Sequence, residues 1–258
     1  MARVYYYGRV VVSGIAFLMF GLGGLLLSFI MVPVLYLVVW NSDRRAVLIR
    51  GLIHHAFRLF IEALVFFRVI TYTVKGFDKL DQPGLLIVAN HPTIMDVVFL
   101  VGFINNAVCL VKQSLFTNPF MGFVIRGARY INNDRPQQSI EQCVQALHDG
   151  LTTIVFPEGT RTARGKKIQL HRGAAYVALH SHLPLTPVSI RCVPGWLTKE
   201  DRWYEVPELP IRFEFSVGED LSVQSSYSEP TEALRARHAT AIIRQTLFGE
   251  VLAEQPGA

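Results

Sequence analysis

The amino-acid sequence predicts an α/β domain, with helices on the faces of a sheet, that follows an N-terminal membrane-associated helical segment. Beyond Tyr72, short apolar runs typical of strands alternate with helical patterns. Before Tyr72 the chain is far more apolar, and it carries no charged residue from Val10 to Ser42. The length of 258 residues suits one such domain with an added segment. We therefore expect two regions, residues 1–71 and 72–258.

The composition favours an anionic partner. Apolar residues make up 51% of the chain and charged residues only 17%, which is below the usual quarter. The net charge of +5 fits nucleic acid, a membrane surface or a phosphorylated substrate, so charge alone does not choose among them. The cysteines at positions 109, 143 and 192 are widely spaced, without a C-x-x-C pair. We expect neither a disulfide framework nor a zinc site, and a reducing compartment.

The charge-free run exceeds the roughly 20 apolar residues that cross a bilayer. It lacks the small-residue cleavage pattern of a signal peptide, so we expect it to be retained. The sequence "GLGG" at Gly21 to Gly24 and Pro33 interrupt it, which leaves open one kinked span or two short helices that dip in and return. Basic residues after the run outnumber Arg3 and Arg9 before it. The positive-inside tendency therefore predicts an inner (plasma) membrane location with the domain on the cytoplasmic side.

Residues 43–70 have an apolar pattern of near-helical period that is punctuated by five arginines. This pattern is typical of a helix that lies in the membrane interface. The alternative is a helix that simply packs on the domain core. His54 and His55 are adjacent and would face apart on a helix, so they do not predict a metal site.

The elements of the second region follow from the apolar pattern and its turn signals. We expect strands near residues 85–89, 107–111, 128–131, 152–156, 186–191 and 212–217. We expect helices at 94–104, 119–126, 137–148, 170–180 and 231–252. The Pro-rich and aromatic stretch 194–210 predicts a loop over one face of the domain.

The first candidate site is "NHPTIMD", residues 90–96, at the exit of a predicted strand. If Thr93 caps a helix that begins at Ile94, the side chain of Asp96 points back toward the turn that holds His91. An aspartate on one ring nitrogen would leave the other as a general base, in a dyad without its own nucleophile. The same residues also satisfy a capping box, which would explain Asp96 without catalysis.

The second candidate site is "FPEGTRT", residues 156–162, again at a strand exit. Gly159 permits a close backbone approach, and Arg161 offers a planar fork suited to phosphate. Further basic residues follow closely, namely Arg164, Lys166 and Lys167. The alternative is a solvated charged turn.

Two weaker segments complete the set. "VKQSLFTNPFMGFVIRGARYINNDR", from Val111 to Arg135, pairs apolar positions with basic ones that include Lys112, and an amphipathic helix and strand would explain most of it. "LPLTPVSI", from Leu183 to Ile190, has prolines at a strand start, where they usually shape a turn.

In this order and at these distances, the four segments resemble the ordered blocks of the lysophosphatidic acid acyltransferase family, also called 1-acylglycerol-3-phosphate acyltransferases. The resemblance covers roughly residues 72–220. Its specific part is the H-x4-D element followed about sixty residues later by F-P-E-G-T-R. It implies a glycerolipid acyltransferase fold, a mixed sheet flanked by helices.

The resemblance also implies transfer of an acyl group from acyl-CoA or acyl-carrier protein to the hydroxyl of lysophosphatidic acid, without metal, cofactor or covalent enzyme intermediate. His91 would remove the hydroxyl proton, and Asp96 would hold the imidazole. The remaining residues that it implies would position the acceptor's glycerol phosphate: Glu158, Gly159, Thr160 and Arg161, with added charge from Arg135 and Lys112.

Departures from the family pattern leave the acceptor open. Pro92 and Thr93 follow His91 where many relatives have a polar residue and serine, and "LHRGAA" at 170–175 replaces a more usual phenylalanine and lysines. Another lysophospholipid, an ornithine lipid or an aryl polyene lipid is an alternative acceptor. A non-enzymatic membrane protein that binds anionic lipids is a second alternative. We expect membrane lipids as partners and no nucleic acid, while the sequence gives no oligomeric state.

Overall fold

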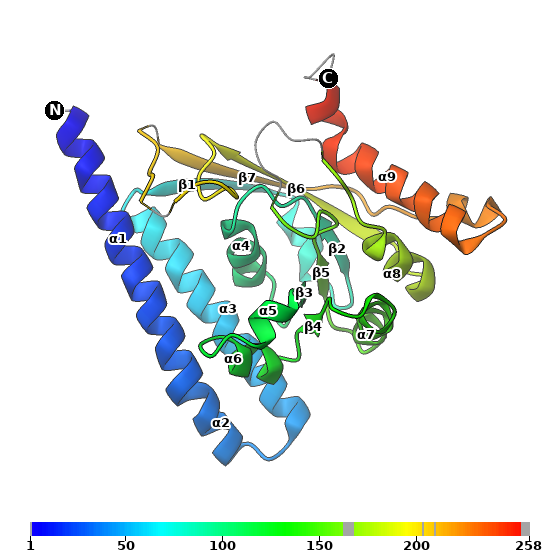
Figure 1. The fold of residues 1–258 in the computed structure, drawn as a ribbon, viewed down its shortest axis with the longest axis horizontal. Coiled ribbons are helices and arrows are strands. Elements are labelled where there is room, and N and C mark those ends of the chain that lie inside the picture. Colours follow the sequence, from blue (N-terminus) through cyan, green and yellow to red (C-terminus); the bar gives the residue numbers. More distant parts are fainter. Residues whose placement is uncertain (1, 162–167, 203, 209, 254–258) are drawn as a thin grey trace.

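The structure is a computed structural model that describes residues 2–161, 168–202, 204–208 and 210–253. Within them, one mixed seven-stranded sheet lies between two layers of helices (Figure 1). The strands are β1 Ile70–Lys75, β2 Leu86–Ala89, β3 Val108–Val111, β4 Ile131–Asn132, β5 Thr153–Val155, β6 Leu185–Val193 and β7 Ile211–Val217. The predicted α/β fold with a mixed sheet is thus confirmed.

The strands follow the order β1-β7-β6-β2-β5-β3-β4. Every neighbouring pair is parallel except β6 and β7, which are antiparallel. All four residues of β2 are buried, because helices cover both faces of the sheet there. Ile87 and Ala89 join one core cluster, and Leu86 and Val88 join the other, as the two-residue period of a strand requires.

Eight helical elements belong to the described part of the second region. They are η2 Phe77–Asp81, α4 Met95–Phe103, α5 Gln113–Phe116, α6 Gly122–Gly127, α7 Pro136–His148, α8 Gly173–Ser181 and α9 Glu232–Ala253, and a short η3 Gln224–Ser228 precedes the last. The core on one face of the sheet includes α4 and α6, and the core on the other includes α7, α8 and α9.

The N-terminal run forms one long rod and does not break at Gly21 to Gly24. Helix α1 (Ala2–Leu26) continues through the π-helical turn η1 (Leu27–Met31) into α2 (Val32–Val38). Pro33 lies in the first turn of α2. The wider π-helical turn before it lets the helix continue although Pro33 has no backbone N–H to donate. Among the described residues, Tyr6–Val38 is one helix long and apolar enough to cross a membrane, by length and composition alone.

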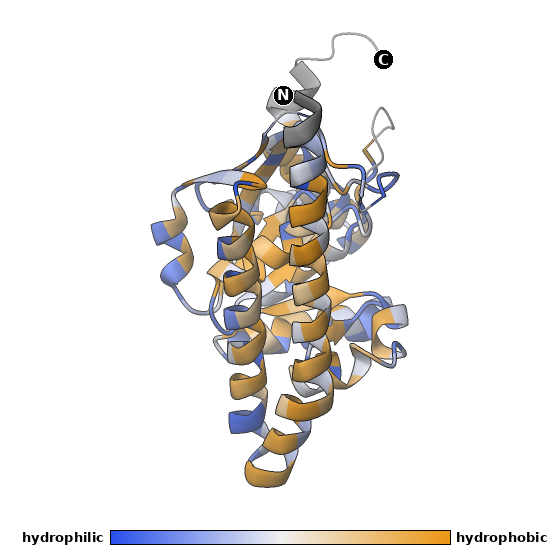
Figure 2. Ribbon diagram, turned by 90° about the vertical axis from the view of Figure 1, so that its left-hand side faces the viewer, coloured by the Kyte–Doolittle hydropathy of each residue, from blue (hydrophilic) through white to orange (hydrophobic). Residues whose placement is uncertain are grey.

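Helix α3 (Ser42–Phe66) runs back beside this rod. The rod is hydrophobic along most of its length, whereas hydrophilic turns alternate with hydrophobic ones along α3 (Figure 2). The Asn41 side chain starts α3 by accepting from the backbone N of Asp43 and of Arg44. One side of α3 is buried against the core, as the packing alternative predicts. Leu59 and Phe66, on other sides of the same helix, are exposed, as an interfacial helix requires.

Three predictions for the second region were wrong in detail. Strand β1 was not predicted, and it begins before the expected boundary at residue 72. The helix expected at 119–126 begins only at Gly122, as α6, and the short helix α5 before it was not predicted. The strand expected from residue 128 begins only at Ile131, because Ala128 still caps α6 and Arg129 turns the chain with a φ of 57°.

Candidate active site

The predicted site segments lie at one edge of the sheet. Residues 90–96 follow β2, residues 157–161 follow β5, and Lys112 follows β3. Strand β5 pairs in parallel with β2 on one side and with β3 on the other, so the carboxyl ends of the three strands lie at the same edge. In open α/β sheets this edge is where ligands bind.

His91 and Asp96 form the predicted pair. Nδ1 of His91 lies 2.9 Å from Oδ2 of Asp96. The same Oδ2 accepts from the backbone N of Thr93 at 2.7 Å, and the Thr93 hydroxyl donates to Oδ1 at 2.7 Å. The helix begins at Met95, one residue later than expected. The contacts of the capping box and the contact between His91 and Asp96 therefore occur together, because one carboxylate makes both.

Burial and a neighbouring aromatic ring surround the His91 and Asp96 side chains. Asp96 is fully buried, and this burial raises the pKa of its carboxyl above the usual value, against the hydrogen bonds from His91 and Thr93 that favour the charged form. An ionised Asp96 accepts from Nδ1–H and leaves the lone pair on Nε2 of His91. The imidazole stacks on the Phe156 ring, with centroids 4.3 Å apart. Its side chain is 15% exposed, so a substrate can still reach it.

Two polar side chains tie the β2 exit to its neighbours. The buried carboxylate of Glu158 accepts from the backbone N of His91 at 2.7 Å. The Asn90 amide donates to the Ile190 carbonyl at 2.8 Å and accepts from the Ile190 backbone N at 2.6 Å. Asn90 was not predicted as a site residue, although it stands directly before His91. These contacts fix the backbone of the turn that holds the imidazole.

Gly159 and Arg161 lie in the turn after β5. Gly159 has a φ of 64°, and a Cβ at this position would lie 2.9 Å from the His171 ring. Nη1 of Arg161 donates to the carbonyl of Leu197 at 3.0 Å and to that of Thr198 at 2.8 Å. Thr160 between them is partly buried. Thr162 and the predicted basic residues Arg164, Lys166 and Lys167 lie outside the described residues.

The Leu197 carbonyl joins the two motifs. It also accepts from the backbone N of Ile94 at 3.2 Å, so the start of α4 and the Arg161 guanidinium share one acceptor. The structure thus brings residues 90–96 and 157–161 together through Glu158 and through Leu197.

Lys112 and Arg135 lie farther along the same edge. Lys112 precedes α5, Arg135 precedes α7, and both side chains are exposed. Among the described residues, neither side chain has a hydrogen bond or ion pair to the residues around His91. Their role in binding stays a prediction.

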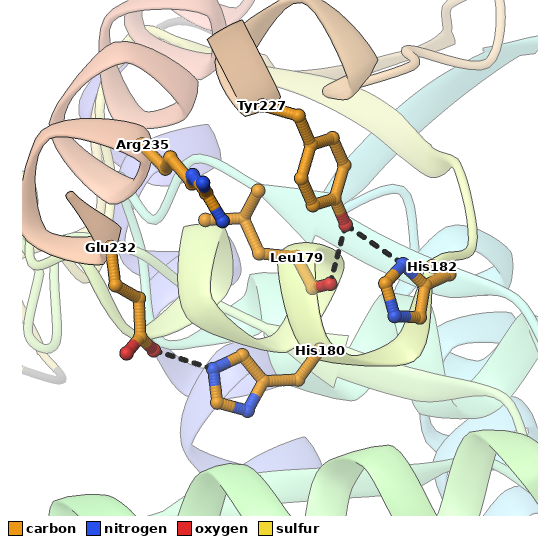
Figure 3. A pocket seen from close by; sticks show the side chains of 6 residues that line it. All are labelled: Leu179, His180, His182, Tyr227, Glu232 and Arg235. Carbon is orange, nitrogen blue, oxygen red and sulfur yellow. Dashed lines mark hydrogen bonds and ion pairs between the residues drawn. The ribbon is translucent and has the colours of Figure 1, made fainter. Parts of the chain in front are cut away.

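Two surface hollows lie apart from His91. The first, of about 380 Å³, is lined by Leu179, His180, His182, Tyr227, Glu232 and Arg235. In Figure 3 most of its polar groups bond to one another: His180 contacts Glu232, and the Tyr227 hydroxyl contacts both His182 and the Leu179 carbonyl. The second, of about 340 Å³, includes His54, Arg58 and Asp81 near the opposite edge of the sheet. Neither contains a predicted site residue.

Comparisons with known proteins agree on one family. Residues 71–191 match the family model described as "Acyltransferase". A 1-acyl-sn-glycerol-3-phosphate acyltransferase from Pseudomonas aeruginosa is 28% identical over 133 residues, which cover 49% of this chain and 52% of that protein. One from Helicobacter pylori is 25% identical over 181 residues, which cover 67% and 76%. The chain spans about half the length of the first relatives that it matches.

A solved structure shares the whole fold. The crystal structure of PlsC, the 1-acyl-sn-glycerophosphate acyltransferase from Thermotoga maritima, matches with a TM-score of 0.65 over 100% of both chains. The sequence identity is 18%, so this likeness shows the fold alone.

Proposed function

Because residues 71–191 belong to the Acyltransferase family, we propose that the chain moves a fatty acyl group from acyl-CoA or acyl-carrier protein to the free hydroxyl of lysophosphatidic acid, which gives phosphatidic acid. The observation that carries this proposal is the 2.9 Å contact between His91 Nδ1 and the buried Asp96 carboxylate at a strand exit. The names of the relatives support the acceptor. Identities of 25 to 29% to these relatives are too low to fix it.

In the proposed reaction, Nε2 of His91 takes the proton from the acceptor hydroxyl as its oxygen attacks the thioester carbonyl. Asp96 keeps the proton on Nδ1 and stabilises the imidazolium that forms. When the tetrahedral intermediate collapses, the C–S bond breaks and the thiolate takes the proton from His91. The products are the ester and the free thiol, and the imidazole is again neutral. The substrate alcohol is the nucleophile that the dyad itself lacks.

Arg161 is the proposed contact for the acceptor phosphate. Its Nη1 is held by two backbone carbonyls, which fixes the plane of the guanidinium for a phosphate on its remaining N–H groups. Gly159 and Thr160 would line the same turn. Arg135 and Lys112 would add positive charge along the edge.

The proposed part of Glu158 differs from phosphate binding. A carboxylate repels a phosphate, and this one already accepts from the His91 backbone. We assign it to positioning the His91 turn beside the acceptor site.

The N-terminal rod fits an enzyme that takes its acceptor from a bilayer. Its apolar side chains, such as Leu22, Phe29 and Leu37, are exposed, and a lipid phase would cover them. We propose a plasma-membrane location with the site on the cytoplasmic side, where both donors occur. Residues 1–71 would be the membrane-associated region and residues 72–258 the acyltransferase domain.

The deciding experiment incubates purified protein with labelled acyl-CoA or acyl-carrier protein and a panel of lysolipids, with products identified by mass. We expect transfer to lysophosphatidic acid, and a loss of about 10²-fold or more in turnover for His91→Ala. His55→Ala is the matched control, because His55 is an exposed histidine on α3.

Other outcomes have definite meanings. Transfer only to another lysophospholipid, an ornithine lipid or a polyene lipid would replace the acceptor and keep the chemistry. Lipid binding without transfer would favour the non-enzymatic alternative. Full turnover in His91→Ala would reject the mechanism.

A further inference from the structure

The loop from Pro194 to Asp201, here called the Trp196 loop, lies between the apolar helix α1 and the proposed acceptor site. The Trp196 side chain is completely buried, and the next two residues, Leu197 and Thr198, are also buried. The backbone N of Thr198 donates to the Asp201 carboxylate at 3.0 Å. The loop is therefore a packed element with a defined shape.

On one side the loop is held by α1. The Trp196 ring lies with its centroid 5.8 Å from the Phe17 ring. Phe17 also packs on Phe60 of α3, at 5.9 Å. Buried aromatic pairs of this kind contribute more than their area alone, so the position of Trp196 depends on where α1 lies.

On the other side the loop holds the site. The carbonyls of Leu197 and Thr198 both accept from Nη1 of Arg161. Both hydrogen bonds of Arg161 within the described part of the chain are thus made to this loop. Leu197 has a φ of 55°, a conformation that a leucine keeps only where its surroundings impose it.

These contacts form a short chain from α1 to the guanidinium. Trp196 is bonded directly to Leu197, so a shift of the indole ring moves the carbonyl that orients Arg161. We propose that Phe17 and Trp196 are positioning residues for Arg161, and that the seating of α1 thereby sets the affinity for the acceptor phosphate. This inference rests on the proposed function of Arg161. It adds that the membrane helix controls acceptor binding from a distance.

The test is a double-mutant cycle between Phe17→Ala and Arg161→Ala, with a short-chain lysophosphatidate as acceptor and acyl-CoA as donor. We expect Phe17→Ala to raise the acceptor KM about 10-fold and to leave the donor KM unchanged. In the Arg161→Ala background, Phe17→Ala should have no further effect on the acceptor KM, because the group that it positions is gone.

Phe20→Ala is the matched control. Phe20 lies on the same helix and packs on Phe57 and Phe60, with centroids 5.7 and 4.4 Å away, and it has no ring contact with Trp196. Its loss should lower stability to a similar extent and leave the acceptor KM unchanged. If Phe17→Ala does not fold, Phe17→Leu carries the same cycle, since it keeps apolar volume but removes the ring.

The outcomes separate the two proposals. Additive effects of the two substitutions, or an equal rise in acceptor KM for Phe20→Ala, would overturn the positioning role and leave the enzyme function intact. A wild-type protein that transfers no acyl group to lysophosphatidate would overturn the proposed acceptor, and this inference with it.

Discussion

The backbone N–H of His91 donates a 2.7 Å hydrogen bond to the carboxylate of Glu158, 67 positions later in the chain. The two residues follow β2 and β5, which pair in parallel. The bond therefore spans adjacent strand exits and joins the proposed base to the turn that holds Arg161. It holds the two motifs side by side at this edge of the sheet.

This bond predicts a difference between two substitutions of Glu158. Glu158→Gln keeps a carbonyl oxygen for the His91 N–H, so turnover should stay within about 10-fold of wild type. Glu158→Ala leaves that N–H unpaired in a buried site, which costs about 1–3 kcal/mol, and it frees the His91 turn. We expect it to lose at least about 10²-fold in kcat, measured at saturating substrates.

The control for this pair is Glu219→Ala. Glu219 forms an exposed ion pair with Lys79, and such pairs contribute little. Its loss should change neither kcat nor the free energy of unfolding appreciably. Equal turnover in Glu158→Ala and Glu158→Gln would show that the bond to His91 does not position the dyad.

Asp96→Asn should separate charge from geometry. An amide oxygen can accept from His91 and Thr93 N–H groups, and its NH₂ can donate to the Thr93 hydroxyl, so the local structure should persist. It cannot stabilise an imidazolium, and we expect kcat to fall about 10²–10⁴-fold.

The same substitution gives a prediction for stability against pH. Burial raises the pKa of Asp96 in the folded protein. Such a carboxyl stabilises the fold most below its unfolded pKa of about 4, and this contribution is lost as pH rises through the folded pKa. Asn does not titrate. The free energy of unfolding of Asp96→Asn relative to wild type should therefore rise between pH 4 and pH 7, and a fall over that range would contradict the buried-charge account.

The local part of the site was predictable from sequence. His91 and Asp96 are only five positions apart, and the geometry of a helix start is enough to bring them together. The bond between His91 and Glu158 was not predictable in this way. It depends on β2 and β5 being neighbours in the sheet, which is a property of strand order and not of either motif.

In the fold, too, local features were predictable from the sequence and features that depend on strand order were not. The alternation of strands and helices predicted the sheet, because its central apolar runs, β2 and β5, are buried along their whole length. Strand β1 was missed since Ile70–Lys75 follows directly on the apolar pattern of α3, where a composition change was taken as a boundary. Its residues are mostly β-branched or aromatic, which is a local strand signal that was overlooked, whereas its pairing with β7 is a property of strand order. The hydrogen bond from Arg161 to the Leu197 carbonyl was likewise not predictable, because it depends on a loop that folds back to the site from 36 positions later in the chain.

Gly159→Ala should weaken the turn mainly through its backbone. A φ of 64° is unfavourable for alanine by about 1–2 kcal/mol. The new Cβ would also meet the His171 ring at 2.9 Å, but His171 is exposed and its ring can turn away. We expect the unfolding free energy to fall by about that amount and the acceptor KM to rise. Adding His171→Ala to Gly159→Ala should not restore the unfolding free energy. Full restoration would show that the contact with the His171 ring causes the loss of stability.

Arg50→Ala should destabilise the fold without a specific effect on transfer. Arg50 of α3 is 4% exposed, and it donates to the Asn106 side chain at 2.6 Å and to the Ala128 carbonyl at 3.0 Å. Its removal leaves both acceptors without these bonds in a buried site, which predicts a loss of about 2–4 kcal/mol in chemical denaturation. Arg58→Ala on the same helix is the control, because its ion pair with Glu62 is half-exposed and should contribute about 1 kcal/mol or less. Equal losses for the two variants would show that Arg50 does not join α3 to the domain.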